Sequence, residues 1–170
     1  MAIPPKADPK LFNPATRGIT INTDASFCPE TKAGGWAVYI VCDDFKIQKS
    51  GKFRGTMKSA LEAEMKAIGN ALVILLLKKE VPRFHFVYVN TDCKNAIRDI
   101  EGSTTPLGKR INGYWTTLNT RTSSRLKKFR HVKAHSNVAD SRSFVNDWCD
   151  KEAKRCMRIR REEIKKLIKK

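Results

Sequence analysis

The chain of 170 residues is most simply one domain, and it is long enough to bury a core of its own. Its 34 Lys and Arg outnumber 17 Asp and Glu, which gives a net charge of +17. Such an excess favours a polyanionic partner, most simply nucleic acid, although a solubilising surface or an exposed tail is the alternative. Five scattered cysteines without a Cys-x-x-Cys spacing argue against a disulfide framework and a zinc site.

The N-terminal residues 1–17 hold four of the seven prolines, which predicts an extended leader with little secondary structure. No apolar segment of a secretory signal is visible there. The longest apolar run, residues 71–77, is too short to cross a bilayer. We therefore expect a cytoplasmic protein in a reducing compartment, with no membrane partner.

Three strands are predicted to follow as an antiparallel meander. Residues 19–27 alternate apolar and polar side chains, as a half-buried strand does. Gly34-Gly35 opens a β-branched and aromatic run over 36–42, and Asp43-Asp44 reads as the turn into a third strand over 45–54.

A long helix is predicted over residues 59–77, where apolar residues recur at steps of three and four. Ser59 is its expected N-cap, and Glu62 completes the pattern of a capping box. Residues 84–92 then form a fourth strand, and the strand–helix–strand order predicts that it lies parallel to the first.

Helices are expected over 94–100 and 107–118, the second with Tyr114 and Trp115 facing inward. A fifth strand is predicted over 125–132 and a polar loop over 133–142. A last helix then begins near Ser143 and runs toward the end of the chain. The predicted fold class is α/β, with a five-stranded mixed sheet of three antiparallel strands and two parallel additions, flanked by helices.

Two of these strands end in the same tripeptide, Asn-Thr-Asp, at Asp24 and at Asp92. Either acid alone could be a turn former at the end of a strand. In parallel strands, however, both carboxylates lie at the carboxyl edge of one sheet, where open α/β sheets place their ligands. The doubled motif therefore favours a shared site.

Two further acids are candidates for the same site. Glu64 lies in the first turns of the long helix, where it could merely favour the helix N-terminus. Asp150 lies on the last helix, where Asp147 or Glu152 could be the inward acid instead. Crowded carboxylates in a basic protein imply a divalent cation, and oxygen ligands favour Mg²⁺ or Mn²⁺. Two such ions suit phosphodiester hydrolysis.

Six motifs in order give the chain a likeness to a known family. They are Thr23-Asp24-Ala25-Ser26, Gly34-Gly35-Trp36-Ala37, Ala63-Glu64-Met65-x-Ala67-Ile68, Asn90-Thr91-Asp92, Val132-Lys133-Ala134-His135 and Asn146-x-x-Cys149-Asp150-x-x-Ala153. Together they resemble type 1 ribonuclease H, over most of the chain.

The resemblance implies an endonuclease that hydrolyses the RNA strand of RNA–DNA hybrids with two divalent ions and leaves 5′-phosphate products. By position, Asp24 would bridge the metals, and Glu64 and Asp92 would complete the first site. Asp150 falls on the last acid of the family. His135 falls on the loop histidine that the family uses in proton transfer or product release.

We further expect a monomer, and a division into a Pro-rich leader over 1–17, a ribonuclease H-like catalytic domain over 18–157 and a basic helical extension over 158–170. Ala60-Leu61 stand where the family usually reads the hybrid with amide side chains. The six candidates for nucleic-acid binding are Ser26, Ser59, Lys94, Lys109, Arg110 and Lys133.

Two other functions stay open from the sequence. One is a different nuclease of the same superfamily, such as a junction resolvase or a DNA endonuclease, because a fold does not settle the substrate. The other is a nucleic-acid-binding module without catalysis, against which the survival of all four acids argues.

Overall fold

This computed structural model describes residues 18–42, 45–79, 84, 86–122, 126–133 and 141–170. Four sequence-based predictions lie wholly or mostly outside the described residues: the leader over 1–17, the turn at Asp43-Asp44, the polar loop over 133–142 and the position of His135. None of the helices in the described part of the chain combines the length and the apolar character that a membrane crossing requires.

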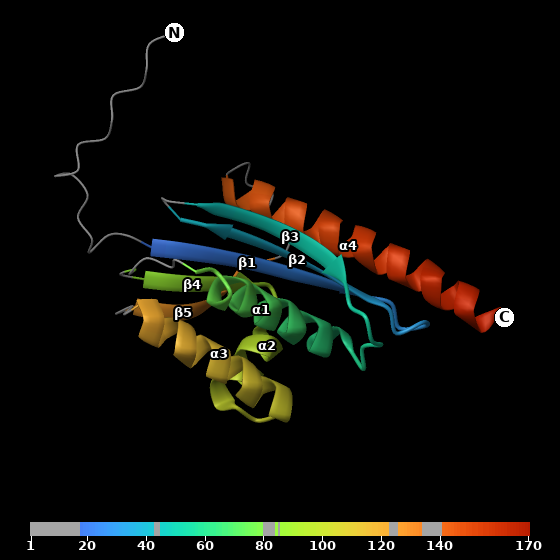
Figure 1. The fold of residues 1–170 in the computed structure, drawn as a ribbon, viewed down its shortest axis with the longest axis horizontal. Helices are drawn as coiled ribbons and strands as arrows, with labels where there is room; N and C mark the ends of the chain where they lie inside the picture. The colour runs from blue at the N-terminus through green and yellow to red at the C-terminus, as the bar shows by residue number, and fades with distance from the viewer. Residues whose placement is uncertain (1–17, 43–44, 80–83, 85, 123–125, 134–140) are drawn as a thin grey trace, which may run out of the picture.

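One mixed sheet of five strands organises the molecule, in the order β3-β2-β1-β4-β5 (Figure 1). The strands β1 (Gly18–Phe27), β2 (Gly34–Val41) and β3 (Lys46–Lys52) form the antiparallel meander. The strand β4 (Phe86–Thr91) pairs in parallel with β1, and β5 (Leu126–His131) pairs in parallel with β4. This is the predicted fold class, which is thereby confirmed.

Within the described part of the chain, four helices cover the sheet in two layers, and α4 is the one helix on its own face (Figure 1). The other face carries α1 (Ala60–Leu76), which packs on β1 and β2, and α2 (Lys94–Gly102) and α3 (Pro106–Thr122) beside it. The last helix, α4 (Ser141–Ile168), is continuous through residues 157 and 158 and packs on β1, β2 and β3.

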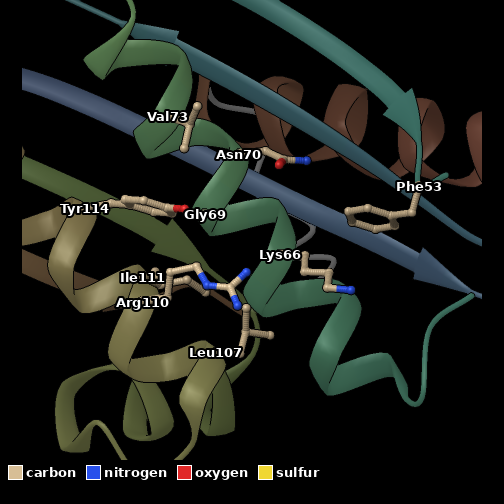
Figure 2. Close-up of a pocket in the computed structure, with 9 residues that line it drawn as sticks. All are labelled: Phe53, Lys66, Gly69, Asn70, Val73, Leu107, Arg110, Ile111 and Tyr114. Carbon is tan, nitrogen blue, oxygen red and sulfur yellow. The ribbon is translucent and has the colours of Figure 1, made fainter. Parts of the chain in front are cut away.

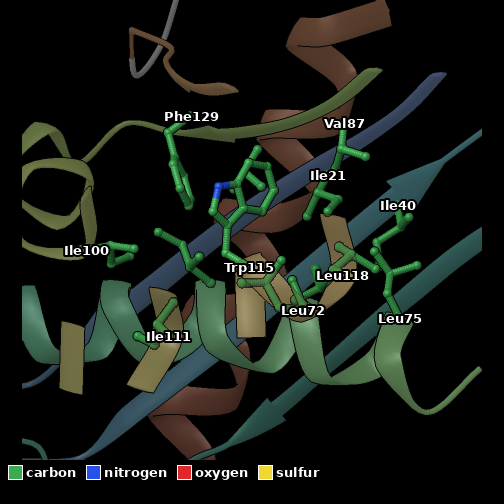
Figure 3. Close-up of a cluster of buried hydrophobic side chains, with 14 of the residues drawn as sticks. Ile21, Ile40, Leu72, Leu75, Val87, Ile100, Ile111, Trp115, Leu118 and Phe129 are labelled. Atoms are coloured by element: carbon green, nitrogen blue, oxygen red, sulfur yellow. The ribbon is translucent and has the colours of Figure 1, made fainter. Parts of the chain in front are cut away.

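The larger core lies between the sheet and α1–α3, where Ile21, Leu72 and Trp115 are buried together (Figure 3). A smaller cluster under α4 includes Cys149, which is buried as a small core residue. The prediction that Tyr114 and Trp115 both face inward is half right. The Trp115 ring is buried 4.7 Å from the Phe129 ring at an interplanar angle of 42°, whereas Tyr114 is only partly buried against the same core and lines a groove between α1 and α3.

The N-terminus of α1 is capped as predicted, but the capping box is incomplete. The Oγ atom of Ser59 accepts a hydrogen bond from the Glu62 backbone N–H at 3.1 Å. The Glu62 carboxylate accepts the backbone N–H of Lys58, not that of Ser59. The first turn of α1 is therefore fixed from both sides of the cap, which sets the position of Glu64 one turn later.

Gly35 lets α4 approach the sheet closely, because a Cβ there would collide with backbone atoms of Ala153 and Met157. Backbone cannot swing aside as a side chain can. We therefore expect Gly35→Ala to lower the free energy of unfolding by about 1–3 kcal/mol. Urea unfolding measures the loss.

The matched control is Gly113→Ala, on α3, where a Cβ would meet no atom within 4 Å. There alanine is expected to stabilise the helix by about 0.5–1 kcal/mol. Equal unfolding midpoints for the two variants would contradict the close packing of α4 on β2.

Candidate active site

A notch at the carboxyl edge of the sheet holds the candidate site. The parallel pairing of β1 with β4 ends at Asn22↔Asn90, and β4 itself ends at Thr91. Beyond that point β1 continues only against β2, with Asp24 opposite Ala37. Asp24 therefore stands beside the end of β4, where Asp92 is the first residue after the strand.

Three carboxylates meet in this notch. Asp24, Glu64 and Asp92 each offer an oxygen atom, and these atoms all lie within 4.8 Å of one another. The backbone N–H of Ala25 links two of them, because it donates to Asp24 Oδ1 at 2.8 Å and to Glu64 Oε1 at 3.3 Å. The Oε2 atom of Glu64 is buried and has no hydrogen-bond donor among the described residues.

Burial and mutual repulsion perturb the titration of this cluster. Burial, followed by the charge of Asp92, raises the pKa of Asp24 to about 7 from an ordinary 3.8. Burial and the charges of Asp24 and Asp92 raise the pKa of Glu64 to about 9 from 4.5. Ionising Asp24 and Glu64 together at neutral pH is therefore costly until a cation is close by.

The three candidate acids of α4 differ in their burial and in their partners. Asp150 is half-buried, bonded to Lys154 Nζ at 2.7 Å, and close enough that its charge further raises the pKa of Asp24. Asp147 is exposed and pairs with Lys151. Glu152 points toward β3, where it accepts the Ser50 hydroxyl at 2.7 Å. Asp150 is thus the α4 acid that faces the cluster, although it is outside the 4.8 Å group.

Directly behind the acids lies a polar row that the sequence-based reasoning did not anticipate. Asn90 Nδ2 donates to Asn22 Oδ1 at 2.9 Å, and Arg130 Nε donates to Asn90 Oδ1 at 2.8 Å. Both asparagines are buried. The doubled Asn-Thr-Asp was the available signal, because equal offsets from Asp24 and Asp92 place the two asparagines side by side in parallel strands.

A histidine that is not among the candidate site residues lies beside the acids. His131, at the end of β5, has its Nε2 atom 3.0 Å from the backbone carbonyl oxygen of Asp92. This contact ties the end of β5 to the residue that follows β4. His131 is exposed, so it also lies at the rim of the notch.

The candidates for nucleic-acid binding fall into two groups. Ser26 follows Asp24 on β1, Ser59 caps α1, Lys94 opens α2 two residues after Asp92, and Lys133 follows β5; all four belong to segments at or next to the carboxyl edge. Lys109 and Arg110 are exposed on α3.

Arg110 lines a groove between α1 and α3, together with Lys66 and Tyr114 (Figure 2). The groove has a volume of about 230 Å³, and none of the clustered acids lines it. The structure therefore does not bring Arg110 together with the acidic site.

The sequence profile of a family described as RNase H matches residues 16–158. The chain belongs to the RNase H family. No curated protein sequence matches the chain at the threshold applied.

Solved structures of this family share the fold at low sequence identity. LC11-RNase H1 in complex with an RNA/DNA hybrid has a TM-score of 0.59 and 18% identity, over 82% of this chain and 96% of the other. The N-terminal RNase H domain of Rv2228c from Mycobacterium tuberculosis has a TM-score of 0.63 and 12% identity, over 87% and 99%. RNase H1 from the archaeon Halobacterium salinarum has a TM-score of 0.56 and 15% identity, over 82% and 96%.

Proposed function

We propose that this protein is a metal-dependent endoribonuclease that hydrolyses the RNA strand of RNA–DNA hybrids. The observation that carries the proposal is the group of three carboxylates within 4.8 Å, set at the sheet edge of an RNase H-family chain with a net charge of +17. Acids crowded at this spacing suit divalent cations, and the basic remainder of the chain suits a polyanion.

The carboxylates present fit a hard divalent cation. All the candidate ligand atoms are oxygen atoms. The buried Oε2 atom of Glu64 accepts no hydrogen bond from the described residues, so it is free to bind a metal ion. We assign Asp24, Glu64 and Asp92 as ligands, with Asp150 as the fourth acid of a site for two ions. When bound, Mg²⁺ or Mn²⁺ would polarise the phosphodiester and offset the developing negative charge.

The residues of the chain itself would prepare this site. The Ala25 N–H holds the Asp24 and Glu64 carboxylates in a common orientation. Lys154 forms an ion pair with Asp150 at 2.7 Å, which fixes the position of that carboxylate on the side of α4 that faces Asp24. The proposed role of His135 in proton transfer or product release rests on the sequence motif.

The substrate part of the proposal rests on the family and on the edge residues. LC11-RNase H1 has been solved with an RNA/DNA hybrid, and it shares the fold of this chain. Ser26, Ser59, Lys94 and Lys133 belong to segments around the acidic edge and could contact the two strands. We expect 5′-phosphate ends on the cut RNA.

A panel of labelled substrates tests the function. RNA–DNA hybrid, duplex RNA, duplex DNA and a four-way junction are each incubated with the protein in Mg²⁺, Mn²⁺ or EDTA. We expect cutting of RNA within the hybrid alone, and only with a divalent cation. Cutting of the junction or of duplex DNA would instead indicate another nuclease of the superfamily, and binding without cutting would indicate a non-catalytic module.

The end of α4 provides a separate prediction about affinity. The side chains of Leu167 and Ile168 are 67% and 76% exposed, so the last residues of α4 make little packing contact with the rest of the protein. Removing residues 165–170 deletes four lysines and should change the free energy of unfolding by less than about 0.5 kcal/mol. If the tail contacts phosphates, the salt dependence of hybrid affinity should flatten by about 0.9 per lost contact. An unchanged slope, measured by fluorescence anisotropy, would rule out those contacts.

A further inference from the structure

One half of the α4 face of the sheet is not covered by α4. Among the described residues, α4 packs on β1, β2 and β3 and makes at most marginal contact with β4 or β5. The register places Phe86 and Tyr88 of β4 on this same face. Tyr88 pairs with Thr20 of β1, and Thr20 lies on the face of β1 that continues into the face of β2 where Tyr39 packs under α4. Lys128 of β5 pairs with Tyr88 and shares the face.

Three flat groups form a stack on this half, which no described helix covers. The rings of Phe86 and Tyr88 lie 4.6 Å apart at an interplanar angle of 27°. The guanidinium carbon of Arg130 lies 4.1 Å from the Tyr88 ring centroid. Phe86, Tyr88 and Arg130 are each partly exposed, and Lys128 beside them is exposed.

The stack is fixed by its neighbours before any ligand arrives. Arg130 is held by its bond to Asn90 at 2.8 Å, so its plane cannot swing away freely. The Phe86 ring lies over Gly18, where any Cβ would overlap the ring. A rigid set of planes loses little conformational entropy when it binds, which favours stacking ligands.

We propose that the Phe86–Tyr88–Arg130 stack, with Lys128 beside it, is a binding surface for single-stranded nucleic acid. Sheet faces that combine aromatic rings with cations bind unpaired bases by stacking and their phosphates by charge. The net charge of +17 favours the same polyanion. Paired bases in a duplex offer no free faces, so the surface distinguishes single strands from duplexes.

The surface goes beyond the proposed hydrolysis and does not depend on it. Phe86, Tyr88, Asn90 and Asp92 alternate along one strand and its end, so the stack leads toward the acidic notch. Six residues of extended strand span about 20 Å. A single strand bound on the stack would thus lie next to the notch without occupying it.

Binding of labelled single strands in EDTA tests the proposal with the full chain. Oligo-rU and oligo-dT are the probes, and blunt duplex DNA is the comparison, all at physiological salt. Phe86→Leu keeps an apolar side chain but removes the plane, and we expect about tenfold weaker binding of one or both single strands. Duplex affinity should stay unchanged. Loss for rU alone or for dT alone would name the preferred strand.

Charge and location are tested separately. Lys128→Glu should weaken single-strand binding. It should also make the affinity less dependent on salt, by about the amount that one phosphate contact contributes to the slope of log affinity against log salt. The charge-matched control is Lys49→Glu, on β3 at the opposite edge of the sheet, and the exposed Phe144→Leu controls for loss of a surface aromatic ring. Photo-crosslinking with iodouracil-substituted strands should mark the peptide that contains residues 86–88.

Three results would overturn the proposal. One is a Phe86→Leu variant that remains folded by circular dichroism and binds single strands as wild type does. Another is crosslinking confined to other segments, which decides the matter even where Phe86→Leu fails to fold. An equal loss of duplex and single-strand affinity would likewise show a general electrostatic surface and contradict stacking.

Discussion

Asp24→Asn is expected to abolish metal-dependent cleavage while the protein stays folded and binds nucleic acid at least as well as wild type. Asp24 is one of the three clustered carboxylates that we assign as metal ligands, so the substitution removes a ligand from the proposed site. Cation stabilisation of a transferring phosphoryl group contributes several kcal/mol, so the rate should fall about a thousandfold or more. Single-turnover cleavage of a labelled hybrid measures the loss, and filter binding measures the affinity.

The same substitution should raise the stability of the metal-free protein, because it removes a partly buried carboxyl group that the charges of Asp92 and Asp150 repel. Asp147→Asn is the matched control, since Asp147 is an exposed acid of α4 paired with Lys151. It should leave cleavage unchanged. A folded Asp24→Asn variant that cuts at the wild-type rate would refute the assignment of the site.

The metal-free protein should lose stability as the pH rises from about 4 to about 9. The pKa values of Asp24 and Glu64 are raised in the folded state, to about 7 and about 9. At a pH between the unfolded and the folded pKa values of these two groups, the folded state binds more protons than the unfolded state. The free energy of unfolding therefore falls as the pH rises. The full stability is present below the unfolded pKa values. The loss should be on the order of a few kcal/mol.

Divalent cation should reverse this loss, because it binds the ionised carboxylates of the folded state only. Thermal melts in EDTA and in Mg²⁺ across this pH range measure both effects. The increase in melting temperature on adding Mg²⁺ should be larger at pH 9 than at pH 5. The Glu64→Gln variant cannot ionise at this position, so its melting temperature in EDTA should depend less on pH than that of wild type. A wild-type melting temperature in EDTA that is independent of pH would contradict the crowding of the three acids.

The order of elements and the sheet could be predicted because their signals are local. Apolar alternation over β1, the three-four spacing of α1 and the Ser59 cap each act within a few residues of sequence. The meeting of Asp24 and Asp92 also followed from the sequence, because parallel strands joined by one crossover must end at the same edge.

Contacts between distant elements were harder to predict. The Asn22–Asn90–Arg130 row depends on register across three strands, and only the repeated tripeptide hinted at it. Arg110 is basic and exposed, but whether α3 presents it to the acids or to the groove beside Lys66 is decided by helix packing. The choice of Asp150 over Glu152 likewise depends on the helical phase of α4, since residues two apart face different sides.

The cleavage of an RNA–DNA hybrid labelled in each strand in turn tests the central claim most directly. With wild-type protein and Mg²⁺, we predict that the RNA strand is cut at internal positions while the DNA strand remains whole, and that EDTA stops the reaction. An intact RNA strand in both Mg²⁺ and Mn²⁺, or a cut DNA strand, would contradict the proposal that the carboxylates of Asp24, Glu64 and Asp92 form a hybrid-specific ribonuclease site.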